Sequence, residues 1–343
     1  MPCIFGKGKN NLTDEHVFPA FVGATLKVKN GSCKKCNAEC SKFEDKVAAQ
    51  TKTARHIFEI PNRYGRIPSA PVAVEIPETG LAPVTARREP GGEIRLQDFV
   101  AETKSEDGTN IRDGFFVSEE NAKRFIEKSR SRGEKVTELD VPKEVTLLSS
   151  GQQVIDFAFS VEIRKMVAKI ALVSVAYRYG TEYACLPQFD TLRRAILVGN
   201  GDDLPLRIFA NKDFASDYVR TPHQHTVRAH LSAGMHKGWA VVTLFGGLSY
   251  VVELTRRFEE NESRSFSLFF NADSQETFNP IVLFSEQEII GRVLSHETAF
   301  EQVDAIDAQW YPIVERYCKE NGIDISRIPP APAVPSANTG RSV

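Results

Sequence analysis

Long apolar runs are absent from this sequence, and neither sign of charge is in large excess. No stretch approaches the roughly 18–20 apolar residues of a membrane-spanning helix, so we expect no insertion into a membrane. The 343 residues carry 43 Lys and Arg against 45 Asp and Glu, a formal net charge of −2. This balance excludes an argument for nucleic-acid binding from the charge of the whole chain.

Cysteine is also scarce, at six residues, and no apolar leader follows Met1. Both absences speak against a disulfide-rich secreted protein and predict a cytoplasmic one. What is present is ordinary for a soluble globular chain: 41% hydrophobic and 26% charged residues. The length is sufficient for two domains with buried cores.

The composition changes along the chain and predicts three parts. Residues 1–56 contain ten Lys or Arg against five Asp or Glu, which suits a polyanionic partner or a merely solvated surface. Residues 57–328 are expected to form a larger mixed α/β domain. The segment 329–343 is rich in proline and is expected to be disordered.

The N-terminal segment reads as two strands followed by a helix. We expect a strand over 2–5, a Gly/Asn turn over 7–11, and a return strand over 15–18 that ends at Pro19. Apolar residues at helical spacing predict a helix over 37–49. This is the order of a ββα unit.

Further elements are predicted by capping residues and periodicity. A long amphipathic helix is expected over 160–179, ended by Gly180, and an antiparallel hairpin is expected across Gly246-Gly247. Together with the ββα unit they predict an α+β protein. The other expected elements are a helix over 118–132, a strand over 264–271 and a helix over 298–321.

Four of the six cysteines lie near the N-terminus, and their spacing suits a metal. Cys33-x-x-Cys36 holds two thiols on one turn, a spacing suited to tetrahedral zinc, and Cys3 is placed to be a third ligand. The fourth ligand stays open between Cys40 and His56.

Three polar residues offer the chemistry of phosphodiester hydrolysis. His16 could act as a general base near neutral pH, while Glu15 and Asn37 could hold Mg²⁺ or Mn²⁺ through oxygen atoms. Taken singly, each also suits a structural role: a solvated charge, a hydrogen-bonded imidazole and a helix cap.

Residues 3–50 resemble the HNH endonuclease family in its zinc-ribbon form. The resemblance is carried by Cys-Ile-Phe, then Leu-Thr-Asp-Glu-His-Val-Phe-Pro, then Cys-x-x-Cys-Asn and Phe-Glu. It implies a ββα-metal fold that cuts DNA with Mg²⁺ or Mn²⁺, with His16 as general base and with Glu15 and Asn37 as ion ligands. It also implies structural zinc on Cys3, Cys33 and Cys36.

The sequence departs from the family pattern at three places. Gly6 stands where the second cysteine of the first zinc half-site is expected, Gly23-Ala24 replaces Gly-Gly, and the middle asparagine corresponds only approximately to Asn30. Two functions therefore remain in view. The first is a metal-dependent DNA endonuclease, and the alternative is a non-catalytic zinc knuckle that binds nucleic acid or protein beside a regulatory C-terminal domain.

Overall fold

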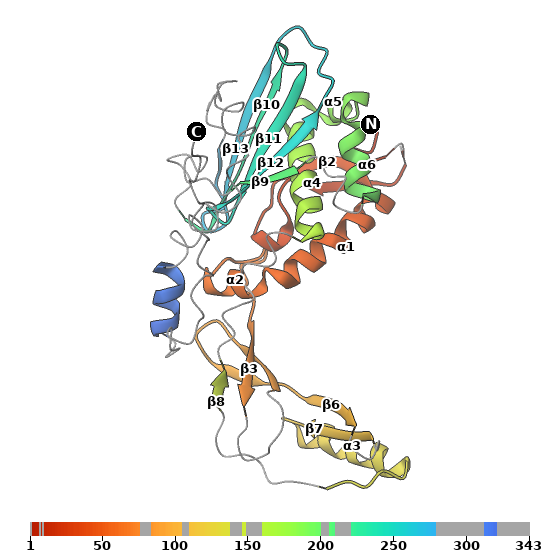
Figure 1. The fold of residues 1–343 in the computed structure, drawn as a ribbon, viewed down its shortest axis with the longest axis vertical. Coiled ribbons are helices and arrows are strands. Elements are labelled where there is room, and N and C mark those ends of the chain that lie inside the picture. The colour runs from red at the N-terminus through yellow and green to blue at the C-terminus, as the bar shows by residue number, and fades with distance from the viewer. Residues whose placement is uncertain are drawn as a thin grey trace, which may run out of the picture. The chain divides into compact units, whose positions relative to one another are not determined.

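The computed structural model combines helices with antiparallel sheets (Figure 1), which confirms the expected α+β class. The residues that it describes are 2–6, 8, 10–75, 84–104, 110–137, 146–148, 160–199, 206–209, 221–278 and 312–320. By its contacts the chain forms two compact units, centred on residues 1–67 with 154–317 and on residues 68–153. We describe each unit by itself.

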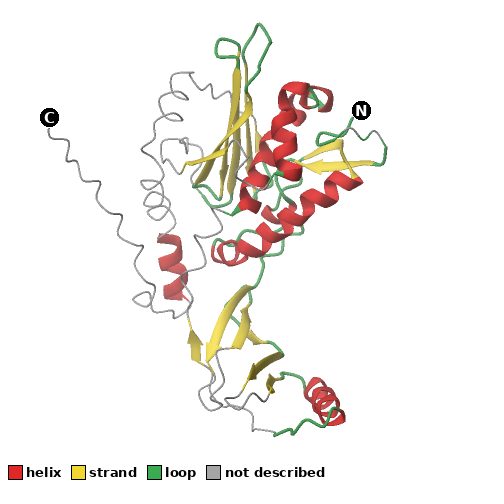
Figure 2. Cartoon of the chain, turned by 45° about the vertical axis from the view of Figure 1, so that its right-hand side comes forward, coloured by secondary structure: helices red, strands yellow, loops and turns green. Residues whose placement is uncertain are grey.

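The N-terminal segment contains two antiparallel strands that lead directly into a helix (Figure 2). Strand β1 (Leu12–His16) pairs with β2 (Lys27–Cys33), and α1 (Lys34–Gln50) follows β2 without a loop. A short turn of 3₁₀ helix, η1 (Ala20–Val22), lies between the strands, and α2 (Lys52–Ile57) follows α1. The expected order of two strands and a helix is therefore present.

The identity of the first strand differs from the prediction. Residues 2–5 do not form a strand, because the chain turns there, with Gly6 N donating to the carbonyl of Cys3 at 3.2 Å. The strand expected over 15–18 is β1, four residues earlier at its start, and its partner is β2. The helix expected from Asn37 is confirmed and begins at Lys34.

Helix α4 (Val161–Tyr179) lies at the centre of the first unit. Ser160 caps its start by accepting from Ile163 N, and Gly180 follows its last residue, as expected. Every residue from Met166 to Ala176 is buried, because α4 contacts α1 and β2 as well as the large sheet. A polar residue inside this stretch must therefore find its partner within the core.

The large sheet has six antiparallel strands in the order β14-β13-β10-β11-β12-β9. The hairpin expected across Gly246-Gly247 is confirmed as β11 and β12, and the strand expected over 264–271 is confirmed as β13. The strands are β9 (Leu206–Phe209), β10 (Gln224–Ser232), β11 (Lys237–Leu244), β12 (Leu248–Thr255), β13 (Arg264–Asn271) and β14 (Thr277–Phe278). Three short helical elements follow α4, namely α5 (Thr181–Ala184), η5 (Pro187–Phe189) and α6 (Asp190–Val198).

One hydrophobic core joins the N-terminal segment to the rest of the first unit. Phe18 and Val47 belong to the same buried cluster as Ile170 of α4 and Tyr250 of β12. We expected a domain boundary after residue 56, and the contacts place residues 1–67 in the same unit as α4 and the sheet.

The second unit carries two small sheets and a surface helix. One sheet has the order β5-β4-β3-β8, from β3 (Ala70–Glu75), β4 (Val84–Arg88), β5 (Ile94–Leu96) and β8 (Thr146–Leu148). The other pairs β6 (Phe99–Lys104) with β7 (Asn110–Phe115). Helix α3 (Glu119–Ser131), capped by Ser118, confirms the helix expected over 118–132.

Near the C-terminus, residues 312–320 are helical, which agrees with the second half of the helix expected over 298–321. The first half of that helix and the proline-rich segment 329–343 lie outside the described residues. None of the described helices combines the length and the apolar character that crossing a membrane requires.

Candidate functional site

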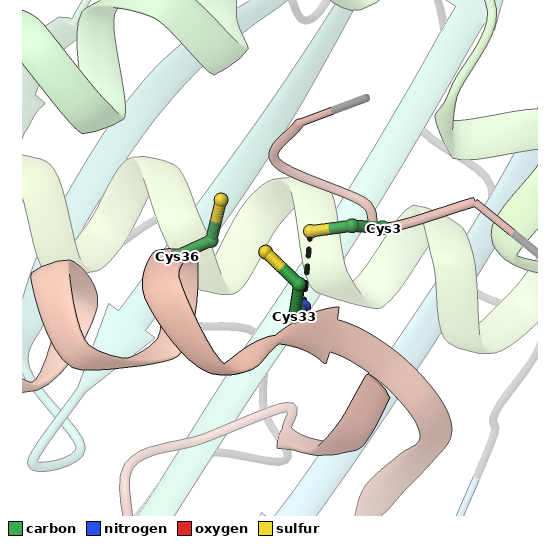
Figure 3. A group of neighbouring side chains, drawn as sticks. All are labelled: Cys3, Cys33 and Cys36. Carbon is green, nitrogen blue, oxygen red and sulfur yellow. Dashed lines mark hydrogen bonds between the residues drawn. The ribbon is translucent and has the colours of Figure 1, made fainter. Parts of the chain in front are cut away.

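Three cysteine thiols converge at the start of α1. The Sγ atoms of Cys3, Cys33 and Cys36 all lie within 4.8 Å of one another. Cys33 ends β2, Cys36 lies in the first turn of α1, and Cys3 reaches them from the turn over residues 3–6. The backbone N–H of Cys33 donates to Sγ of Cys3 at 3.2 Å, so this turn is held against the start of α1 (Figure 3).

The surroundings of these thiols affect their pKa values in opposite directions. Burial opposes ionisation of Cys33, but hydrogen bonds from the backbone and side chain of Cys36 and from Cys3 outweigh it and lower its pKa. Burial raises the pKa of Cys36, and the neighbouring sulfur atoms of Cys33 and Cys3 raise it further. Without a cation, one thiolate shared among thiols is the favoured state. A thiophilic metal would replace the shared protons.

The donor set suits zinc, which prefers thiolate ligands in a tetrahedral arrangement. Within the described ranges, neither Cys40 nor His56 belongs to this thiol group. Cys40 is fully buried on α1, in a region whose charges come from Lys169, Glu15 and Glu44. His56 is buried on α2 and packs edge-on against Tyr317, with ring centroids 5.7 Å apart.

Glu15 is turned into the core. Its side chain is 2% exposed, and its Oε1 lies 2.5 Å from Nζ of Lys169, which is also 2% exposed. Lys169 lies in the middle of α4, and its ammonium also pairs with Glu44 of α1 at 2.5 Å. Burial disfavours the ammonium, but Glu44 and Glu15 outweigh it and raise the pKa of Lys169. The carboxylate of Glu15 is thus part of an ion-pair network that joins β1, α1 and α4.

His16 ends β1 and is half-buried. Burial, followed by the positive charges of Lys27, Lys169 and Arg63, lowers its pKa to about 4, against an opposing effect of Glu15. Its Nε2 lies 3.4 Å from Nη1 of Arg63. The imidazole is therefore neutral at pH 7, the form that can accept a proton.

The surface beside His16 is cationic and aromatic. Lys27 is exposed and is the β2 residue paired with His16 in the β1–β2 register. The guanidinium of Arg63 lies 4.7 Å from the ring centroid of Tyr64 and donates to its hydroxyl at 2.5 Å. Tyr64 is 70% exposed. Stacked aromatic and guanidinium groups on a surface suit contacts with phosphates and bases.

Sequence reasoning missed Arg63 and Tyr64, because they lie beyond the expected module boundary at residue 56. The turn that carries them is well defined. Asn62 accepts through Oδ1 from the backbone N–H groups of Tyr64 and Arg66, and Arg63 N donates to the carbonyl of Ala20 at 3.0 Å. The signal in the sequence is the turn pattern Pro61-Asn62 followed by Tyr64-Gly65.

Asn37 lies in the first turn of α1 and faces β1. Its amide nitrogen donates to the hydroxyl of Thr13 at 3.3 Å, and that hydroxyl donates to the carbonyl of Ser32 at 3.1 Å. Asn30 adopts a left-handed conformation with φ 53°, and its backbone N–H donates to Asp14 at 3.2 Å. Both asparagines thus help to hold the strand pair and α1 together.

The three residues expected to share one catalytic ion have different partners in this structure. Glu15 pairs with Lys169, His16 contacts Arg63, and Asn37 contacts Thr13. The three cysteines expected to bind zinc do lie together. Comparisons of this chain with protein-family models, with curated proteins and with solved structures gave no match. Functional arguments therefore depend on the residues and geometry of this chain and on the resemblance stated above.

Proposed function

We propose that this chain is a nuclease of the HNH type, which hydrolyses phosphodiester bonds in DNA with His16 as the general base. The observation that carries the proposal is the neutral imidazole of His16 at the end of β1, beside the cations Arg63 and Lys27. Its support from sequence is the HNH-like pattern over residues 3–50.

In this proposal the chain's residues divide the work as follows. His16 removes a proton from the attacking water. Arg63 and Lys27 attract the phosphate and stabilise the negative charge that develops in the transition state. Because a bound phosphate is an anion, it also raises the pKa of His16 from about 4 towards neutrality, which makes the imidazole a stronger base. Such contacts read the backbone, so little sequence preference is expected.

The resemblance also implies Mg²⁺ or Mn²⁺ held by Glu15 and Asn37. The arrangement of Glu15 does not fit that role, because its carboxylate is buried and paired with Lys169. We therefore assign no step of the reaction to a hard cation. The dependence of cleavage on Mg²⁺ or Mn²⁺ is left to the experiment.

Supercoiled plasmid is the substrate that tests this proposal. The full chain is incubated with plasmid in Mg²⁺, in Mn²⁺ and in chelator, beside the variant His16→Ala. We expect nicking by the parent and a loss of about 10²-fold or more in the variant. His236→Asn is the matched control, because His236 lies at the end of the β10–β11 hairpin and asparagine tolerates its left-handed φ of 53°.

The second candidate function is a zinc-knuckle module that binds nucleic acid or protein without cutting it. The observation that favours it is the Glu15–Lys169 pair, which occupies the carboxylate that the nuclease family would use. Under this reading the parent and His16→Ala bind DNA equally well with salt-dependent affinity, and neither cuts it.

A further inference from the structure

Residue 6 lies directly over the thiol group. A Cβ atom built on Gly6 would lie 3.2 Å from Sγ of Cys36. The backbone N–H of Gly6 donates to the carbonyl of Cys3, so the turn over residues 3–6 fixes this position. Gly6 is outside the left-handed region of φ, so its backbone conformation does not demand glycine. The site thus has a position at which a side chain could reach the three thiols, and the residue there has none.

Three protein ligands do not complete the coordination of a zinc ion. Zinc in closed structural sites takes four, whereas a site with three keeps one position for water or another external ligand. In the part of the chain that the structure describes, no fourth histidine, cysteine or carboxylate lies within 4.8 Å of all three thiols.

Cys185 is the one further thiol that contacts the turn carrying Cys3. It follows α5, and its Sγ donates to the carbonyl oxygen of Cys3 at 3.4 Å. Its hydrogen bond is therefore with the backbone of the turn, and its sulfur is not part of the thiol group. Because it is so close, the experiment must distinguish it from an external ligand.

We propose that Cys3, Cys33 and Cys36 bind a thiophilic divalent metal through three thiolates, and that the coordination position beside Gly6 is open to water or a small thiol. Binding releases the protons of the cysteine thiols to solvent. A small thiol that enters the open position replaces the bound water and also loses its proton. This inference does not depend on the proposed nuclease activity.

Cobalt is the probe that reports the number of thiolates, because Co²⁺ bound to sulfur has visible and near-ultraviolet absorption. The metal-free full chain is titrated with Co²⁺ without oxygen, in a reductant that contains no thiol. We expect one Co²⁺ per chain with the spectrum of three thiolates and one lighter ligand. Addition of 2-mercaptoethanol should convert it to the spectrum of four thiolates.

The matched variants act at one position. Gly6→Cys should show the four-thiolate spectrum without added thiol, ignore 2-mercaptoethanol, and bind Zn²⁺ at least about tenfold more tightly than the parent. Gly6→Ala adds the Cβ without the thiol, so the number of thiolates should stay at three. Because Gly6→Cys is expected to gain a ligand, its result does not depend on a variant that fails to fold.

Two cysteine variants complete the experiment. Cys33→Ser should lose the three-thiolate spectrum, and Cys185→Ser should behave as the parent does. A parent spectrum of four thiolates that ignores 2-mercaptoethanol would overturn the open position. If Cys185→Ser then showed three thiolates, Cys185 would be the fourth ligand. Absence of Co²⁺ binding by the parent and by Gly6→Cys would overturn the metal site itself.

Discussion

Glu15 and Lys169 form an ion pair in the core of the first unit, with 2.5 Å between Oε1 and Nζ and with both side chains 2% exposed. Glu44 pairs with the same ammonium. The residue next to the proposed general base thus connects β1 to the central helix α4.

Removal of the ammonium should be strongly destabilising. Lys169→Met leaves the carboxylates of Glu15 and Glu44 buried without a cation, and loss of one member of a buried ion pair costs about 3–5 kcal/mol. We expect a fall of that size in the free energy of unfolding, measured by urea denaturation followed by circular dichroism. The triple variant Lys169→Met, Glu15→Gln, Glu44→Gln should recover most of it.

The control for this prediction is an ion pair at the surface. Lys42 and Glu39 pair at 2.8 Å on the exposed side of α1, so Lys42→Ala should leave the unfolding curve unchanged. A Lys169→Met variant as stable as the parent would contradict the role of the buried network.

Stability should fall as the pH is lowered from about 6.5 towards 4. The pKa of His16 is lowered from 6.5 to about 4, and that of fully buried His225 to about 3, in both cases chiefly by burial. Between these values and 6.5 the unfolded chain binds protons that the folded chain does not, so the free energy of unfolding rises with pH. The backbone N–H of Phe245 donates to Nδ1 of His225, and protonation would remove that acceptor.

Thermal unfolding at several pH values measures this effect. We expect a smaller decrease in stability over pH 6.5 to 4 for His16→Gln than for the parent, because glutamine does not titrate. Equal pH dependence in the two proteins would show that His16 has an ordinary pKa in the folded state.

Arg63 should contribute to DNA binding and to the low pKa of His16. Arg63→Gln removes a cation from the surface, so affinity for DNA should fall and the slope of log K against log salt should decrease by about one. The pKa of His16, followed by NMR, should rise, because the charge of Arg63 lowers it. Arg256→Gln is the control, since Arg256 is exposed and pairs with Glu253 on the large sheet. Identical salt slopes for Arg63→Gln and the parent would exclude Arg63 from the binding surface.

Metal removal should destabilise the first unit. The three thiols join the N-terminal turn to α1, so a metal bound there stabilises the folded chain by about 2.7 kcal/mol at one hundred times its dissociation constant. Chelation should lower the unfolding temperature of the zinc-loaded parent and leave Cys33→Ser unchanged. A parent that ignores the chelator and contains no zinc after purification would contradict this prediction.

Local signals in the sequence predicted much of the fold. Ser160 and Gly180 marked both ends of α4, and Gly246-Gly247 marked the hairpin of β11 and β12. The thiol group was also predictable, because two of its members lie on one turn. These features depend on residues close together in the chain.

Features that depend on distant residues were not predictable in the same way. Residues 27–33 read as a loop because they include Asn30 and Gly31, yet they form β2. Gly31 is required there by the close approach of β1, since a Cβ on it would lie 2.8 Å from Cβ of Glu15. Likewise, the partner of Glu15 is 154 residues away on α4, and its only signal was a lysine between apolar neighbours on both sides.

The initial rate of plasmid nicking by the full chain, compared between the parent and His16→Ala under identical conditions, tests the central claim most directly. We predict nicking by the parent and a rate lower by about 10²-fold or more in the variant, with His236→Asn equal to the parent. Equal rates in the parent and His16→Ala, or no nicking by the parent with any of the metals, would contradict the proposed role of His16.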